Sequence, residues 1–110
     1  MSEDGWRAVI ALEELVDRRS TRTDLDGTQV LLYRADERIF AIGNRCTHQG
    51  APLDRGNVRV QGSEATVTCP AHGSMFRLTD GAVVRAPAPA PVPAFQTRVT
   101  DGMVELRPQP

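Results

Sequence analysis

The chain has 110 residues, enough for one domain with its own core but not for two. Its formal net charge of −1 at pH 7 excludes the strongly basic footprint of a nucleic-acid-binding protein. No apolar run reaches transmembrane length, and acidic residues near the N-terminus replace the basic segment that a signal peptide needs. We therefore expect a soluble, cytoplasmic protein that does not contact a membrane.

Short apolar runs separated by turn signals recur along the chain and predict antiparallel β-strands. In chain order the predicted strands are residues 6–12, 28–34, 38–42, 58–60, 65–68, 76–78, 82–84, 95–100 and 103–107. Asp26-Gly27 indicates a hairpin turn, and the continuous apolar run at residues 30–33 is typical of a central strand. Residues 95–100 alternate from Phe95 to Val99 and predict a half-buried strand. The predicted fold class is all-β.

One short helix and two less regular segments complete the prediction. A turn or two of helix is expected at residues 13–18, where Leu15 and Val16 share one face and Glu14 can pair with Arg18. Residues 22–25, just before the first hairpin turn, form a short polar segment. The last three residues, two of them proline, are expected to fray.

Both cysteines and both histidines fall in two short motifs, Cys46-Thr47-His48 and Cys69-Pro70-Ala71-His72. Each motif pairs one thiolate with one imidazole, and both groups are ligands for soft metals. A structural zinc site could use the same four side chains, although such sites usually group Cys with Cys and His with His. A disulfide between the two cysteines would leave both histidines without a role.

The residues around these motifs, CTHQGAPL at 46–53 and CPAHGSMF at 69–76, resemble the two cluster-binding loops of Rieske iron–sulfur proteins. In that family two His replace two Cys on one iron of a [2Fe–2S] cluster. The resemblance extends from Trp6 to Leu106. It implies a single Rieske domain over residues 1–110: an antiparallel β sandwich of stacked sheets with a small cluster-binding subdomain, made of two loops, at about residues 44–78.

The resemblance also implies the site residues of one [2Fe–2S] cluster per chain. Cys46 and Cys69 would hold the inner iron, and His48 and His72 the outer iron near the surface. Ser74 is a further expected cofactor-binding residue, because its hydroxyl could donate to a bridging sulfide; it could equally satisfy backbone groups of its own turn. No catalytic residue is implied.

Two neighbouring segments bear on how the site is covered. Residues 85–94 contain a proline at every second position from Pro87 to Pro93, mostly alternating with alanine, which by composition alone is typical of a polyproline linker. In the Rieske family a proline-containing loop at this position lies against the cluster loops, so we predict a semi-rigid strap there. Pro52 and Leu53 are either core filler or an exposed apolar rim around the histidines, which would suit docking of a redox partner.

The resemblance implies a soluble ferredoxin and not an enzyme: a monomeric one-electron carrier that docks transiently on a ferredoxin reductase and on a terminal oxygenase of a dioxygenase system. The chain has no histidine beyond the two motif residues, so it lacks ligands for the mononuclear iron of large Rieske oxygenases. Two alternatives are a Rieske subunit of a larger oxidoreductase, such as a nitrite reductase small subunit, and a structural zinc module with two Cys and two His ligands.

Overall fold

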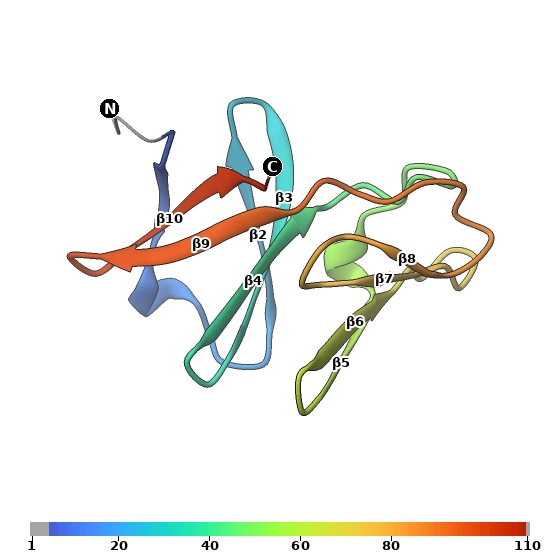
Figure 1. Cartoon of the computed structure of the whole chain (residues 1–110), viewed down its shortest axis with the longest axis horizontal. Helices are drawn as coiled ribbons and strands as arrows, with labels where there is room; N and C mark the ends of the chain where they lie inside the picture. Colours follow the sequence, from blue (N-terminus) through green and yellow to red (C-terminus); the bar gives the residue numbers. More distant parts are fainter. Residues whose placement is uncertain (1–4, 110) are drawn as a thin grey trace.

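The computed structural model describes residues 5–109, and within them ten strands form three antiparallel sheets (Figure 1). The sheets have the strand orders β1-β10-β9, β2-β3-β4 and β5-β6-β7-β8. The strands are β1 Arg7–Ala11, β2 Ser20–Leu25, β3 Thr28–Ala35, β4 Arg38–Gly43, β5 Asn57–Gln61, β6 Glu64–Thr68, β7 Met75–Arg77, β8 Val83–Arg85, β9 Phe95–Thr100 and β10 Met103–Pro108. The predicted antiparallel all-β fold is confirmed.

Strand β3 is the centre of the middle sheet, and its position explains its continuous apolar sequence. Val30 and Leu32 pack in a hydrophobic core shared with β9 and β10, whereas Leu31 and Tyr33 pack in a second core shared with the four-stranded sheet. Successive side chains of a strand point to opposite faces, so burial on both faces requires an apolar residue at every position. Each fully buried side chain contributes about 1.5–3 kcal/mol, and Leu31→Ala is expected to cost about 2–5 kcal/mol.

The predicted helix at residues 13–18 is wrong. The chain instead makes a single 3-10 turn, η1 at Leu12–Glu14, and continues with extended backbone at Leu15. Leu15 is only 3% exposed, whereas Val16 is 54% exposed, so the two side chains do not share a face. Burial of Leu15 beneath the sheets therefore outweighs the local helical pattern.

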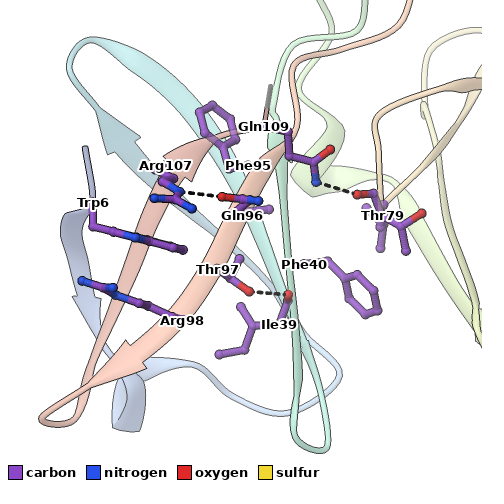
Figure 2. Close-up of a pocket in the computed structure, with 12 residues that line it drawn as sticks. Trp6, Ile39, Phe40, Thr79, Phe95, Gln96, Thr97, Arg98, Arg107 and Gln109 are labelled. Carbon is purple, nitrogen blue, oxygen red and sulfur yellow. Dashed lines mark hydrogen bonds between the residues drawn. The ribbon is translucent and has the colours of Figure 1, made fainter. Parts of the chain in front are cut away.

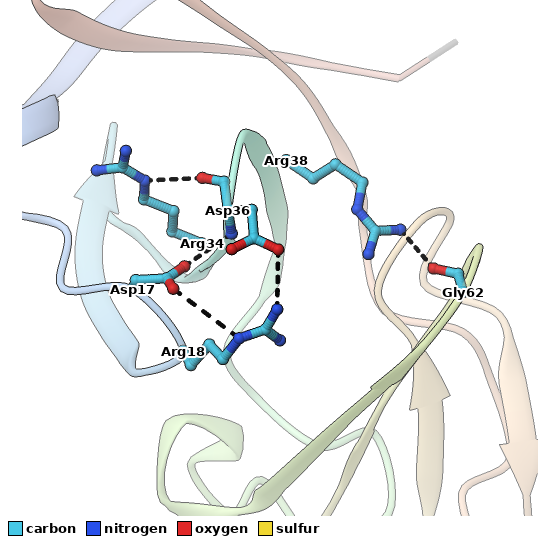
Figure 3. Close-up of polar contacts among 6 residues, drawn as sticks. All are labelled: Asp17, Arg18, Arg34, Asp36, Arg38 and Gly62. Atoms are coloured by element: carbon cyan, nitrogen blue, oxygen red, sulfur yellow. Dashed lines mark hydrogen bonds and ion pairs between the residues drawn. The ribbon is translucent and has the colours of Figure 1, made fainter.

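Arg18 pairs with Asp36, at 2.9 Å, and not with Glu14 (Figure 3). The backbone N–H of Arg18 also donates to the backbone carbonyl of Arg34 near the end of β3, at 2.7 Å. These contacts join the segment after η1 to the β3–β4 turn. A second contact, from the Arg38 guanidinium to the carbonyl of Gly62 at 2.7 Å, ties that turn region to the β5–β6 hairpin.

Strand β9 is less buried than its alternating sequence predicts, because β4 covers only its first part. Ile42 and Ala94 form an isolated bridge, and the Thr97 hydroxyl donates to the Ile39 carbonyl at 3.0 Å. Beyond that point Val99 is 44% exposed. The polar residues before the first hairpin turn, in contrast, do form a strand, β2, at the edge of the middle sheet.

The end of the described chain is ordered and does not fray as predicted. Pro108 ends β10, and the Gln109 N–H donates to the Ala94 carbonyl at 3.0 Å. The Gln109 side chain also donates to the Thr79 carbonyl, at 2.8 Å (Figure 2). Pro110 lies outside the described residues, as do residues 1–4. No helix within the described part of the chain is long and apolar enough to cross a bilayer.

A shallow groove of about 530 Å³ lies between β4 and β9 (Figure 2). Trp6 forms one side of it, with the guanidinium groups of Arg98 and Arg107 over its ring at 4.4 Å and 4.6 Å from the ring centre. None of the four predicted metal ligands lines this groove. The groove therefore lies away from the chemistry that the sequence predicts.

Candidate metal centre

The two Cys–His motifs lie on loops that share one backbone hydrogen-bond frame. We call residues 46–51 loop 1 and residues 69–74 loop 2. In each loop the cysteine N–H donates to the carbonyl five residues later, and the N–H of the glycine four residues later donates back to the cysteine carbonyl. The four bonds are Cys46–Ala51 at 2.9 Å, Gly50–Cys46 at 2.8 Å, Cys69–Ser74 at 2.7 Å and Gly73–Cys69 at 3.1 Å. Each loop thus closes on its own cysteine.

The flanks of the loops match in the same way. Arg45 pairs with Pro52 across the base of loop 1, and Thr68 pairs with Met75 across the base of loop 2. The glycine of each loop has a left-handed backbone, with φ of 77° in loop 1 and 80° in loop 2. Only glycine adopts this conformation at no steric cost, which explains why both motifs carry one at this position.

The two predicted thiol ligands lie inside the core, and the two predicted imidazole ligands lie next to each other nearer the surface. Cys46 and Cys69 are each 2% exposed, belong to the same hydrophobic core and do not form a disulfide. His48 is half-buried and His72 is exposed, and their ring centres lie 4.8 Å apart with the rings at 89°. Two buried thiols beneath two surface imidazoles fit the donor set of a Rieske [2Fe–2S] cluster.

The proline-rich segment lies against both loops, so the predicted strap is confirmed. The Thr47 hydroxyl of loop 1 donates to the Ala90 carbonyl at 2.6 Å. The Ala88 N–H donates to the Ser74 hydroxyl oxygen of loop 2 at 3.0 Å. Ser74 is fully buried, and its oxygen serves the strap and not its own turn. A hydroxyl that accepts one bond keeps its hydrogen for a second partner.

Asn44 and Asp54 are structural residues that sequence reasoning missed. Asn44, 1% exposed, donates from its amide to the Asp54 carboxylate at 2.7 Å, and the Asp54 N–H donates back to the Asn44 amide oxygen at 2.7 Å. Arg22 lies 3.6 Å from the other carboxylate oxygen. This reciprocal pair closes the base of loop 1. The available signal was a polar Asn directly after a buried strand.

Leu53 is fully buried, so the prediction that it belongs to an exposed docking rim is wrong. It starts η2, the second 3-10 turn at Leu53–Arg55, which turns the side chain into the core shared with Cys46. Pro52 is half-buried. Leu53 is therefore core filler beneath the site, which is the first of the two alternatives predicted for its side chain.

Gly56 packs directly against the residue that precedes loop 2. A Cβ at this position would lie 2.1 Å from the carbonyl oxygen of Thr68, the residue before Cys69. No real Cβ contact is that short, so only glycine lets the end of η2 approach the start of loop 2. The packing of the two halves of the site depends on this missing side chain.

A family model described as the Rieske-like [2Fe-2S] domain matches residues 5–107, and the chain belongs to this family. The family carries a [2Fe–2S] cluster, in agreement with the donor set of the two loops. The match spans both loops, the strap and all three sheets.

Individual relatives show which proteins within this family the chain is similar to. The 3-phenylpropionate/cinnamic acid dioxygenase ferredoxin subunit of Photorhabdus laumondii is 30% identical over 89% of this chain and 90% of its own length. The solved ferredoxin of carbazole 1,9a-dioxygenase from Nocardioides aromaticivorans is 30% identical, with a TM-score of 0.84 over 94% of this chain and 98% of its own. A Mycobacterium tuberculosis protein assigned as the small subunit of an NADH-dependent nitrite reductase is 32% identical, with a TM-score of 0.79 over 92% of both chains.

Proposed function

We propose that this protein is a Rieske-type [2Fe–2S] ferredoxin that carries one electron at a time from a ferredoxin reductase to a terminal enzyme such as a Rieske non-haem iron oxygenase. It acts as a carrier and not as an enzyme. The observation that carries this proposal is the pair of matched loops, which hold two thiols inside the core and two imidazoles at the surface. Relatives of this size that are ferredoxin components of dioxygenase systems support it.

The proposed cluster-binding residues are Cys46, His48, Cys69 and His72, with Ser74 donating a hydrogen bond to the cluster. The cluster would supply a one-electron couple, which in Rieske centres lies at about −150 to +300 mV against about −400 mV in plant-type ferredoxins. Replacing two thiolates by neutral imidazoles removes two negative charges, so an added electron is less strongly repelled. The buried cysteines exclude water from the inner side, and the histidine edges offer the shortest path for the electron to a docked partner.

We also propose the domain limits, the oligomeric state and the cellular location of the protein. Residues 1–110 form one domain, and about 44–78 make up its cluster-binding subdomain; the family match over residues 5–107 supports the first of these. The protein is a monomer that docks transiently on its reductase and oxygenase, and it works in the cytoplasm. Size-exclusion chromatography with light scattering and cell fractionation test the last two.

The purified protein tests the function directly. We expect two irons and two acid-labile sulfides per chain, a brown colour, and reversible uptake of one electron. A colourless protein with one zinc and no sulfide would contradict the proposal and favour the structural zinc module.

A second candidate function is the small subunit of a nitrite reductase, which the 32% identity and TM-score of 0.79 to that protein support. The two functions predict different behaviour on native purification. A carrier separates from its partners, because transient redox contacts bury little surface, less than about 1,200 Å². A subunit co-purifies at fixed stoichiometry with a large redox enzyme, and that result would replace the ferredoxin assignment.

A further inference from the structure

The arginines of this protein fall into two groups that differ in what they contact. In the part of the chain that builds the first two sheets, residues 5–43 and 95–109, nearly every arginine has a hydrogen-bond or ion-pair partner. The partners are Asp26 for Arg7, Asp36 for Arg18, Asp54 for Arg22, the Asp36 carbonyl for Arg34, the Gly62 carbonyl for Arg38, Glu105 for Arg98 and Gln96 for Arg107. Figure 3 shows three of these arginines at the β3–β4 turn.

The arginines around the two loops are different. Among the described residues, the side chains of Arg45, Arg55, Arg59 and Arg85 have no hydrogen bond or ion pair, and Arg77 alone in this part has an acidic partner, Asp80. Among the arginines of residues 5–43 and 95–109, only Arg19 has a side chain with no hydrogen bond or ion pair. The protein therefore gives nearly all of its arginines in the first two sheets a polar partner and leaves most of those in residues 44–94 without one.

Two of these unpaired arginines lie beside the loops, one next to each loop. Arg45 directly precedes Cys46, and Arg85 pairs with Met75 immediately after loop 2, where the strap begins. Both side chains are exposed. Figure 1 shows this end of the molecule opposite β1 and the β9–β10 turn.

Arg45 also lies along the surface of loop 1. A Cβ on Gly50 would come within 2.9 Å of the Arg45 Nε, so the absence of a side chain there lets the guanidinium rest on the loop. A groove of about 600 Å³ beside the loop is lined by Arg45, Gly50, Pro52 and Pro93 among others, and no acidic side chain lines it. The groove presents a cation next to the loop that carries His48.

The local charge of this end has the opposite sign to the net charge. The loops, their flanking residues and the strap, residues 45–53, 69–75 and 85–93, contain Arg45 and Arg85 but no Asp or Glu, which gives +2 with neutral histidines, against −1 for the whole chain. One electron on the iron–sulfur group would lower that sum by one and leave it positive. Because charges are screened over about 10 Å at 0.1 M salt, a molecule that approaches the histidines responds to this local charge.

We propose that the end carrying His48 and His72 is a docking surface for a redox protein that presents carboxylates around its electron-exchanging group, with Arg45 and Arg85 as the contacts for those carboxylates. The inference rests on the proposed function and names the chemistry of its partner. An unpaired guanidinium suits this role, because it offers a planar fork of donors that matches a carboxylate in a bidentate pair.

Small redox probes of known charge test the proposal without the natural partner. The reduced holo-protein is mixed with ferricyanide, an anion, or with tris(phenanthroline)cobalt(III), a cation, at rising ionic strength in a stopped-flow instrument. In each reaction one electron passes to the metal complex, with no bond formed or broken. We expect the ferricyanide rate to fall and the cobalt rate to rise with ionic strength. The net charge of the chain would produce the opposite signs.

A matched pair of double variants locates the effect. Arg45→Glu with Arg85→Glu removes both flanking cations, whereas Arg19→Glu with Arg59→Glu makes the same change in net charge at two other unpaired arginines outside the loops and strap. At low ionic strength the first variant should react with ferricyanide about tenfold more slowly than the native protein and lose its fall with salt. The second should keep the native salt dependence. Both should retain the native visible spectrum, and the rates are compared after correction for any change in midpoint potential.

Calorimetric titration of the holo-protein with poly-L-glutamate gives a readout that does not involve electron transfer. Binding should be retained in the Arg19/Arg59 variant and lost in the Arg45/Arg85 variant. A ferricyanide rate that rises with salt in the native protein, or equal effects of the two double variants, would overturn the inference while the protein remains a ferredoxin. A protein without an iron–sulfur chromophore would overturn the proposed function and this inference with it.

Discussion

Loop 1 and loop 2 have the same backbone frame but are supported in different ways. Loop 1 has only the isolated Arg45–Pro52 bridge at its base, and the reciprocal side-chain hydrogen bonds of Asn44 and Asp54 reinforce it. Loop 2 is closed by the sheet itself, because its two ends are paired residues of β6 and β7. The same arrangement of ligands can thus be held by a side-chain network or by strand pairing, and single substitutions should affect the two loops unequally.

The bond that each loop makes to the strap differs in burial. The Thr47 contact of loop 1 is exposed, whereas the Ser74 contact of loop 2 is buried. The loop glycines differ too, since Gly50 lies under Arg45 and a Cβ on Gly73 would meet nothing within 4 Å.

The cysteines should be equivalent, because both are buried at the same place in the same frame. We expect Cys46→Ser and Cys69→Ser each to abolish cluster binding, measured as the loss of iron, acid-labile sulfide and visible absorbance. The apo-protein should also be much less stable around the loops, since ligand binding and loop ordering are coupled. A serine variant that kept full iron and sulfide would show that the replaced cysteine thiolate is not required for cluster binding.

Gly56→Ala should strongly destabilise the protein, because the new Cβ would overlap the Thr68 carbonyl, with only 2.1 Å between them. Pushing the two loop regions apart should cost about 3 kcal/mol of folding free energy. Gly62→Ala is the control: this hairpin glycine has a φ of 58° but open space around it, so it should cost only about 1–2 kcal/mol. Denaturant midpoints of the two holo-proteins compare them, and equal losses would mean that the close approach is not needed.

Asn44→Ala should destabilise loop 1 with little effect on loop 2. The substitution leaves the half-buried Asp54 carboxylate and its N–H without their Asn44 partners, which should cost about 1–3 kcal/mol. Amide hydrogen exchange should accelerate at the loop 1 amides of Cys46 and Gly50 more than at those of loop 2. Uniform acceleration in both loops would show that they are not supported independently.

Ser74→Ala and Thr47→Val separate the two strap contacts. Ser74→Ala leaves the Ala88 N–H without its buried partner and should cost about 1–3 kcal/mol, whereas the exposed Thr47 bond should be worth about 0.5–1.5 kcal/mol. If the Ser74 hydroxyl also donates to the cluster, its removal should lower the midpoint potential, and Thr47→Val should leave it unchanged. An unchanged potential in both variants would confine Ser74 to holding the strap.

The amino-acid sequence by itself determined the fold class and the candidate ligands, because both depend on local patterns. Turn signals such as Asp26-Gly27 and short apolar runs specify antiparallel strands within a few residues of each other. The spacing of cysteine and histidine within each motif is likewise a property of three or four consecutive residues. Even the strap could be anticipated, through the resemblance of the flanking residues to a known family.

Only the tertiary structure decided how these parts support one another. Leu15 leaves its helical pattern to fill the core, and Leu53 points inward and not to the surface, because burial of an apolar side chain depends on what packs above it. Asn44 and Asp54 meet across the base of loop 1. Some arginines find a partner on a distant turn, as Arg18 does with Asp36, and others have none. Such contacts join residues far apart in the chain, so no local pattern records them, and they determine the stability of the loops and the charge that a partner meets.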